Sequence, residues 1–206
     1  MQGLFNLNMQ ESFRTINAPS EGLFKVKGSK FLSFAFPVKS VDEIKSILDE
    51  FRKTYYDARH VCYAWVLGAD RLEFRANDDG EPSGTAGRPI IGQLHSRDLT
   101  DVLVIVVRYF GGVLLGTGGL IVAYREAAAE ALNQALIVEK DVVSEIRLTF
   151  DYLQLNGVMK AVKDTDAHII SQNFENQCEL HLSVTLKQES SLVSKLLNIE
   201  GLKIIS

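Results

Sequence analysis

The sequence predicts an α+β protein of two domains, with residues 1–140 in the first domain and residues 141–206 in the second. In the first part, the apolar run over 102–107 precedes a glycine-rich stretch and then an alanine-rich segment with helical periodicity. In the second part, strand and helix patterns follow in the order β-α-β-β-α-β, which is the ferredoxin-like arrangement. A length of 206 residues is compatible with two domains.

The elements of the first domain follow from periodicity and turn residues. Alternating segments flank Gly28 and Ser29, which predicts a hairpin. Ser40 and Glu43 have capping-box spacing at the start of an amphipathic helix. The run over 102–107 is apolar on both parities, which is typical of a central strand covered on both faces. In order we expect strands within 22–38, a helix from 40, strands 59–67 and 72–76, a loop over 77–89, a short helix 90–94, a strand 102–107 and a helix 120–136.

The second domain is predicted from the same signals. Strand patterns alternate apolar with polar residues, and the helical segments repeat apolar residues every three or four positions. We expect strands 145–150, 168–171, 178–186 and 202–205, with helices 153–162 and 190–197.

Composition narrows the classes of function. The net charge of −4 and the absence of an excess of basic residues in either domain argue against a general nucleic-acid binder. Cys62 and Cys178 lie far apart and are interpreted as reduced core thiols. The first residues lack a basic n-region, and no run reaches the ~20 apolar residues of a membrane helix. We therefore expect a cytoplasmic protein without a membrane partner. Met9 could be an alternative start, with residues 1–8 as a disordered extension.

The stretch RYFGGVLLGTGGL, residues 108–120, could hold a small anion such as phosphate or sulfate. Exposed amides at a helix N-terminus favour anions, and glycine lets a ligand approach the backbone. The spacing matches neither GxxxxGK[ST] nor a complete dinucleotide fingerprint. On local chemistry alone, a tight strand-to-helix turn explains the glycines slightly better than an anion site does, and both interpretations stay open. The candidate anion-binding residues are Arg108, Gly111, Gly112, Gly116, Thr117, Gly118 and Gly119, with Arg88, Thr85 and Ser83 from the preceding loop.

Acidic residues gather in that preceding loop. Asp78, Asp79 and Glu81 could hold Mg²⁺ through oxygen ligands, or they form a solvated acidic turn. Asp79, Glu81 and His60 are candidates for an acid, a base or a group near a metal, although a hydrogen-bonded structural role also fits His60. We predict no resident metal or cofactor, and Mg²⁺ only if the protein is an enzyme.

The densest basic cluster is Lys25, Lys27 and Lys30. On a hairpin, Lys25 and Lys27 are expected to share one face. Nearby phenylalanines suggest a weak RNA-contact surface that stacks bases, but alternating phenylalanines are also typical of a core-facing strand.

Three segments together resemble the signature of the YigZ/IMPACT family (UPF0029), of the bacterial two-domain type. They are DARHVCYAW over 57–65, DDGEPSGTAGRPI over 78–90 and VVRYFGGVLLGTGGLIVAY over 106–124. The resemblance implies an N-terminal two-layer α/β domain of the type found in a ribosomal protein and in GHMP-type kinases. It also implies a ferredoxin-like C-terminal domain similar to domains of elongation factor G.

The resemblance also implies a link to translation. Eukaryotic members resemble the chain only in the first domain and regulate translation by competing for the activator of a kinase of an initiation factor. We therefore expect a translation-linked binding or regulatory factor that contacts RNA, the ribosome or a translation-factor partner. The alternative is a phosphoryl-ligand-binding enzyme that uses the 111–119 and 78–88 loops.

Overall fold

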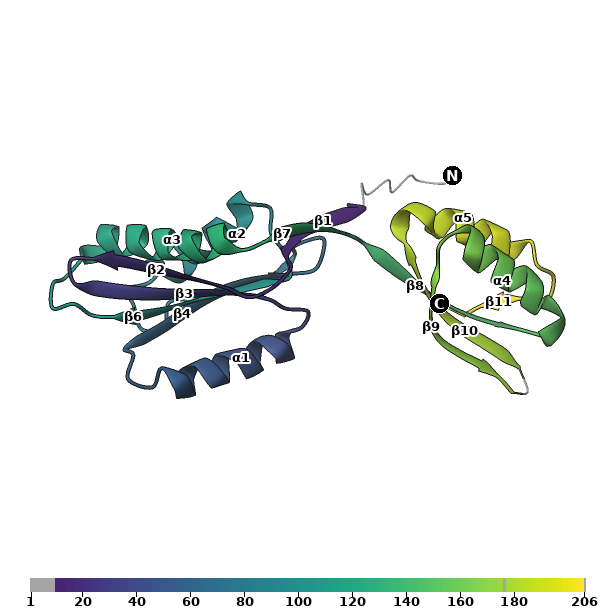
Figure 1. Ribbon diagram of the computed structural model, residues 1–206, viewed down its shortest axis with the longest axis horizontal. Helices are drawn as coiled ribbons and strands as arrows, with labels where there is room; N and C mark the ends of the chain where they lie inside the picture. Colours follow the sequence, from purple (N-terminus) through teal and green to yellow (C-terminus); the bar gives the residue numbers. More distant parts are fainter. Residues whose placement is uncertain (1–9, 176, 206) are drawn as a thin grey trace. The chain divides into compact units, whose positions relative to one another are not determined.

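The computed structural model describes residues 10–175 and 177–205. The chain forms two compact units. One spans Phe13–Lys140, and the other comprises residues 10–12, 141–175 and 177–205. Figure 1 labels the elements of both units.

The unit of residues 13–140 is built on a five-stranded sheet in which every neighbouring pair is antiparallel. The strand order is β2 (Ser20–Val26), β3 (Ser29–Pro37), β6 (Val102–Tyr109), β4 (His60–Leu67) and β5 (Glu73–Asn77). Helices α2 (Gly87–Ser96) and α3 (Gly116–Gln134) cover one face, and α1 (Val41–Thr54) covers the other (Figure 1). The α+β class is confirmed, with α1 as a layer beyond the two expected.

Strand β6 lies at the centre of this sheet, as its apolar sequence predicts. Every residue over 102–107 is fully buried. Val102, Val104 and Val106 pack into the core beneath α2 and α3, whereas Leu103, Ile105 and Val107 pack against the core on the α1 side. Because side chains alternate across a strand, a strand with two buried faces must be apolar at both parities.

Helix α3 lies very close to the sheet. A Cβ atom added at Gly22 of β2 would lie 2.5 Å from the Ala131 backbone nitrogen, so only glycine fits under the helix there. Ala127, Ala128 and Ala131 are fully buried, as expected for small residues that allow close approach. The helix begins at Gly116 and not at residue 120 as predicted, so four residues assigned to the glycine loop form its first turn.

Two further strands were not predicted. β1 (Ser12–Ile16) and β7 (Ile137–Asp141) pair to form a two-stranded sheet. Each is only five residues long and includes polar residues, so neither has a strong periodic pattern.

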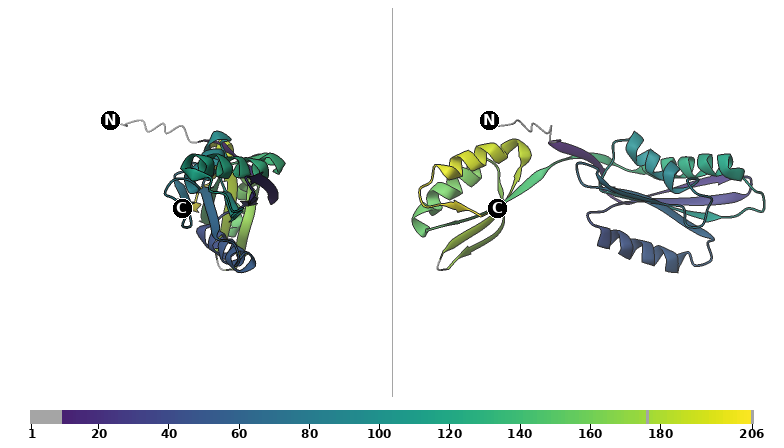
Figure 2. Two further views of the ribbon diagram at one scale, coloured as in Figure 1. Left: turned by 90° about the vertical axis from the view of Figure 1, so that its left-hand side faces the viewer. Right: turned by 180° about the vertical axis from the view of Figure 1, so that it is seen from behind.

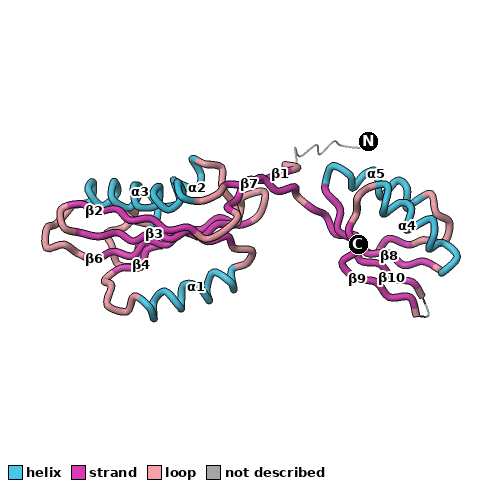
Figure 3. The backbone as a smooth tube through the Cα atoms, viewed as in Figure 1, coloured by secondary structure: helices cyan, strands magenta, loops and turns pink. Residues whose placement is uncertain are grey.

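The second unit has the predicted β-α-β-β-α-β order (Figure 3). Its sheet order is β11-β8-β10-β9, with both helices on one face of the sheet (Figure 2). Inward-facing residues of β8 and β10, such as Leu148 and Leu182, pack against Val158 and Leu192 of the helices. The elements are β8 (Val143–Phe150), the 3₁₀ turn η1 (Tyr152–Gln154), α4 (Leu155–Asp164), β9 (His168–Phe174), β10 (Cys178–Thr185), α5 (Leu186–Leu197) and β11 (Lys203–Ile204).

Among residues 10–175 and 177–205, none of the helices combines the length and the apolar character that a membrane crossing requires.

Candidate functional site

A cavity of about 430 Å³ opens in the 13–140 unit where β6 ends and β4 begins. Its walls come from the start of β4, the 80–82 segment, the end of β6, the loop after β6 and the first turn of α3. Five predicted site residues line it: His60, Glu81, Arg108, Gly116 and Thr117. The structure therefore brings together the two loops that the sequence separates by almost thirty positions. The remaining lining residues are Arg59, Gly80, Pro82, Phe110, Leu114, Leu115 and Leu120.

A buried ion pair forms the polar end of this cavity. Arg108 Nη1 donates to Glu81 Oε1 over 2.6 Å, and the Tyr124 hydroxyl donates to the same oxygen over 2.8 Å. Arg108 is only 7% exposed and Glu81 only 8%. His60 Nε2 lies 3.9 Å from Glu81 Oε1.

Strand register explains why these side chains meet. His60 of β4 and Phe31 of β3 are the residues directly opposite Arg108 of β6. Residues opposite each other in neighbouring strands project from the same face. The Arg108 guanidinium therefore lies 5.5 Å from the centre of the Phe31 ring and 5.8 Å from that of Phe110, both within cation–π range.

Arg108 is not fully satisfied by its neighbours. Within the described part of the chain, its buried Nε atom has no hydrogen-bond partner. Leaving a buried donor unpaired costs about 1–3 kcal/mol, so native proteins rarely retain such a group. The Nε atom is itself buried, so this unpaired donor does not face the cavity, and Arg108 borders the cavity only through the small part of its guanidinium that stays exposed.

The acidic loop is held by its own carboxylates. Asp78 Oδ1 accepts from the amides of Ala86 and Gly87 at 2.9 and 2.8 Å, and Oδ2 accepts from Gly84 at 2.8 Å. Partial burial alone would raise the pKa of Asp78, but these three amides and the nearby Arg88 lower it below its usual value. Asp78 therefore organises the loop that forms one wall of the cavity.

Asp79 and His60 are also engaged. Asp79 Oδ2 accepts from the Val61 amide over 2.7 Å, and the His60 Nδ1–H donates to the Asp79 carbonyl oxygen over 2.7 Å. Among the described residues, no group of three or more His, Cys, Asp or Glu side chains is placed to hold a metal ion. The acid, base and Mg²⁺ roles of these groups stay predictions.

Three predicted anion ligands of the 78–88 loop lie outside the cavity lining, as do four glycines of the glycine-rich stretch: Gly111, Gly112, Gly118 and Gly119. Thr85 is buried, and its hydroxyl donates to the Pro82 carbonyl over 2.6 Å. Ser83 and Arg88 are exposed, and Arg88 lies near Asp78. The structure does not place them with Arg108, because the loop turns between Pro82 and α2.

Gly111 is required by packing. A Cβ atom added there would lie 1.9 Å from the Gly28 carbonyl carbon and 2.1 Å from the Ser29 nitrogen. The Gly111 amide also donates to Ser29 Oγ over 3.1 Å. The loop after β6 is thus held against the turn of the β2–β3 hairpin.

The other glycines of this stretch differ from Gly111. Gly112 and Gly116 have φ of +86° and +70°, and a Cβ atom at either would meet nothing within 4 Å. Gly118 also faces open space but has no positive φ, whereas a Cβ at Gly119 would lie 3.1 Å from that of Leu115. Packing and backbone conformation therefore explain Gly111, Gly112 and Gly116 but leave Gly118 without a structural reason.

The lysine cluster is divided between the two faces of the hairpin. Lys25 and Lys30 are exposed and directly opposite each other, on the side of the sheet that faces α1. Lys27 lies in the turn and lines a separate hollow of about 320 Å³ beside α3 with Phe24. The prediction that Lys25 and Lys27 share one face is wrong, because Lys27 belongs to the turn and not to the strand.

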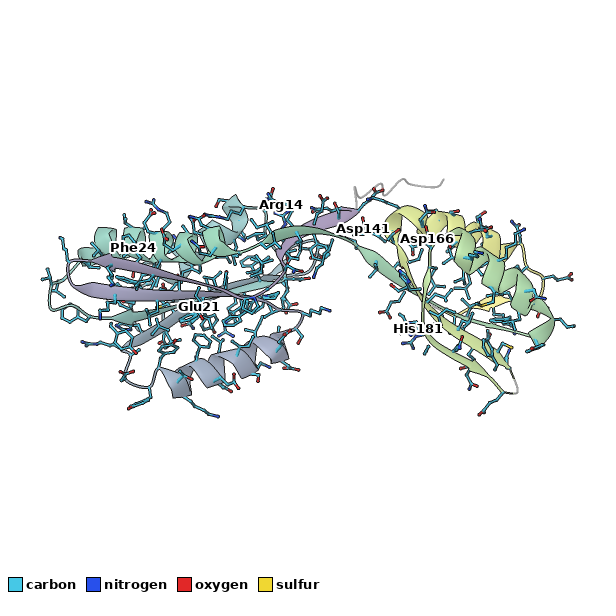
Figure 4. The ribbon with its side chains drawn as sticks, viewed as in Figure 1. Arg14, Glu21, Phe24, Asp141, Asp166 and His181 are labelled. Atoms are coloured by element: carbon cyan, nitrogen blue, oxygen red, sulfur yellow. The ribbon has the colours of Figure 1, made fainter. Side chains whose placement is uncertain are left out.

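The phenylalanines near these lysines belong to the core. Figure 4 labels Phe24 and Glu21 on opposite sides of β2, with Phe24 toward α3. Phe31 is fully buried against Tyr124, and Phe34 packs edge-on against Phe51 of α1. Phe31 and Phe34 are therefore not available for stacking, whereas Phe24 is partly exposed beside Lys27, and the RNA-contact surface stays a prediction.

Four residues at or next to the cavity were not predicted as site residues: three line the cavity, and Tyr124 is hydrogen-bonded to the lining residue Glu81. Tyr124 was assigned only to the buried face of a helix, and Arg59, Phe110 and Leu114 were given no role. Tyr124 is the one residue with a polar group among the small and aliphatic residues of the buried α3 face. A hydroxyl in such surroundings must find a partner, which is the signal that could have identified it.

The fold and this cavity define a class of two-domain α+β protein with a Gly-rich loop after the central strand of its first domain. Residues 27–132 match the family model described as the Impact N-terminal domain. The chain is 34% identical over 188 residues to "IMPACT family member YigZ" of Escherichia coli (strain K12), covering 90% of this chain and 92% of the relative. It is 31% identical over 183 residues to "IMPACT family member YvyE" of Bacillus subtilis (strain 168), covering 89% and 84%.

A solved structure titled "Crystal structure of an hypothetical protein" matches with a TM-score of 0.76 and 32% identity, covering 96% of this chain and 98% of that chain. The chain belongs to the IMPACT family.

Proposed function

We propose that this protein is a translation-linked binding or regulatory factor that contacts the ribosome, with the cavity beside Arg108 as a recognition site. Membership in the IMPACT family supports the link to translation, because the signature segments of this chain resemble those of family members that regulate translation. The observation that carries the binding role is the cavity lining, in which two arginines, Arg59 and Arg108, stand beside one acid, Glu81.

Binding is favoured over catalysis by the engagement of the polar groups. The carboxylates of Asp78 and Asp79 accept hydrogen bonds from backbone amides. His60 Nδ1 is bonded to a carbonyl oxygen, and Glu81 is bonded to Arg108 and Tyr124. A phosphoryl-transfer enzyme needs a group free to take a proton or hold Mg²⁺. These engagements leave His60 Nε2, which lies 3.9 Å from Glu81 Oε1, as the remaining candidate base, and such an enzyme stays the alternative.

Co-sedimentation with ribosomes tests the proposal. Wild-type protein should pellet with ribosomes at low salt, and less protein should pellet at moderate salt because the contact includes charges. Arg59→Glu, an exposed change at the cavity, should reduce the pelleted fraction. Arg75→Glu on the edge strand β5 makes the same charge change at another exposed site and should not.

Absence of wild-type protein from the ribosome pellet at both salt concentrations would refute the ribosome contact. An equal loss with Arg59→Glu and Arg75→Glu would instead show that overall charge, and not the cavity, controls the association.

A further inference from the structure

We infer that the cavity beside Arg108 binds a nucleotide unit, with its phosphate near the first turn of α3 and its base against Phe110. The inference names the ligand class of the recognition site in the proposed function, and in that sense it rests on it. The nucleotide could be free or part of an RNA strand, because the two share the same phosphate and base.

The first support is the positive character of the cavity. Arg59, Arg108, Glu81 and His60 are its ionisable lining residues. Glu81 is paired with Arg108, which leaves the charge of Arg59 without a matching acid in the lining. An anion is therefore the favoured occupant.

The second support is the N-terminus of α3. This 19-residue helix has no acidic residue in its first turn, and its N-cap residue, Leu115, makes no side-chain hydrogen bond to it. The first amides of such a helix lack partners and carry partial positive charge. Gly116 and Thr117 of this turn line the cavity and are exposed, so a phosphate oxygen can approach the amides and the Thr117 hydroxyl.

The third support is the incomplete bonding of Arg108. Its guanidinium has five N–H donors in a planar fork that matches a phosphate, and Glu81 is bonded only to Nη1. This observation is independent of the helix N-terminus, because Arg108 comes from the end of β6. Both point to the same occupant.

The remaining wall indicates more than inorganic phosphate. Phe110 is 46% exposed and Leu114 is 83% exposed at this cavity, and Leu115 and Leu120 continue the apolar lining. An aromatic ring with an exposed face stacks with any nucleobase. A volume of about 430 Å³ also lies within the range of small-molecule sites. A nucleotide would use the polar and apolar walls together.

Titration calorimetry on the full chain tests the inference with four probes: adenosine monophosphate, adenosine, inorganic phosphate and a single-stranded hexaribonucleotide of adenosine. The monophosphate should bind about tenfold or more tightly than adenosine or inorganic phosphate, because only it engages both walls. Tighter binding of the hexaribonucleotide than of the monophosphate would identify RNA as the source, and the reverse would identify a free nucleotide. The inference would be overturned if neither adenosine monophosphate nor the hexaribonucleotide binds, or if all four probes bind with equal affinity.

Thr117→Glu separates a ligand role from a structural one. A carboxylate in the first turn of α3 complements the helix dipole, so the melting temperature should stay the same or rise. The same carboxylate repels a phosphate, so affinity for adenosine monophosphate should fall about tenfold or more. Ser190→Glu, an exposed change in α5 with the same charge, should leave the affinity unchanged. Unchanged affinity in Thr117→Glu would overturn the inference.

Phe110→Ala tests the base position. Its affinity for adenosine monophosphate should fall to that for inorganic phosphate, and an undiminished preference for the monophosphate would contradict the stacking pose. If the protein binds nucleotide but does not associate with ribosomes, the proposed ribosome contact is refuted and the nucleotide site is not. Ribosome association without nucleotide binding would remove this inference alone.

Discussion

Replacing Gly111 with alanine should destabilise the 13–140 unit more than any other single methyl group added to the glycine-rich stretch. The new Cβ would lie 1.9 Å from the Gly28 carbonyl carbon and 2.1 Å from the Ser29 nitrogen, and both are backbone atoms that cannot rotate away. Forcing a methyl group into a packed site costs about 1–3 kcal/mol. Separating the two segments also breaks the hydrogen bond from the Gly111 amide to Ser29 Oγ, which contributes about 0.5–1.5 kcal/mol. The total of about 1.5–4.5 kcal/mol corresponds to a fall in melting temperature on the order of 10 °C.

Tryptophan fluorescence is the appropriate assay. The chain has one tryptophan, Trp65, which is 6% exposed in β4 and therefore reports the unfolding of the 13–140 unit. Gly118→Ala is the matched control, because its Cβ meets nothing within 4 Å and its φ is not positive. Alanine is favoured over glycine inside a helix by roughly 0.5–1 kcal/mol, so this variant should be stabilised. Equal melting temperatures for Gly111→Ala and wild type, or a comparable loss in Gly118→Ala, would refute the steric reasoning.

Three further outcomes are expected. Asp78→Asn should lower stability by about 1–3 kcal/mol at neutral pH, because an amide cannot accept on both sides. Because folding lowers the pKa of Asp78, its carboxylate stabilises the fold above the unfolded value of 3.8, and this stabilisation is lost as the pH falls through the folded pKa. The difference in unfolding free energy between wild type and Asp78→Asn should therefore shrink in acid, and a constant difference would contradict this reasoning. Burial raises the pKa of the Cys62 thiol, so alkylation of this residue at pH 8 should require unfolding. Mass spectrometry would locate the alkylated cysteine, and rapid labelling of Cys62 in the native protein would show that it is not buried. Lys30→Glu should stabilise the hairpin by about 0.2–1 kcal/mol opposite Lys25, a gain that added salt should reduce.

The sequence predicted the elements that carry strong periodicity and missed those that depend on a distant partner. The apolar run of β6 and the alanine face of α3 were correctly assigned, because each pattern reports its own burial. β1 and β7 were not, because five-residue strands become strands only by pairing with each other. The first turn of α3 was also missed, since glycine has a low helix propensity and a glycine-rich turn looks like a loop.

The candidate site shows the same division. Glycine spacing and the position of Arg108 at a strand end directed attention to the end of the sheet where the cavity lies. The partner of Arg108 depends on the path of the 78–88 loop, which no local pattern specifies. Glu81 lies at the end of a turn, and its buried side chain lines the cavity. Arg88, seven positions later, is exposed on α2. Judged by residue type alone, Glu81 and Arg88 were both candidates for the site.

The bonds of Asp78 bear on how the cavity forms during folding. Its three amide partners lie only six to nine positions along the chain, so closing these contacts costs little chain entropy. The Arg108–Glu81 pair spans 27 positions and needs strands β4 and β6 to be aligned first. The 78–87 segment, which forms one wall of the cavity, can therefore fold locally before the sheet is complete. Acid conditions that protonate Asp78 should slow the assembly of the cavity and also lower the stability of the folded protein.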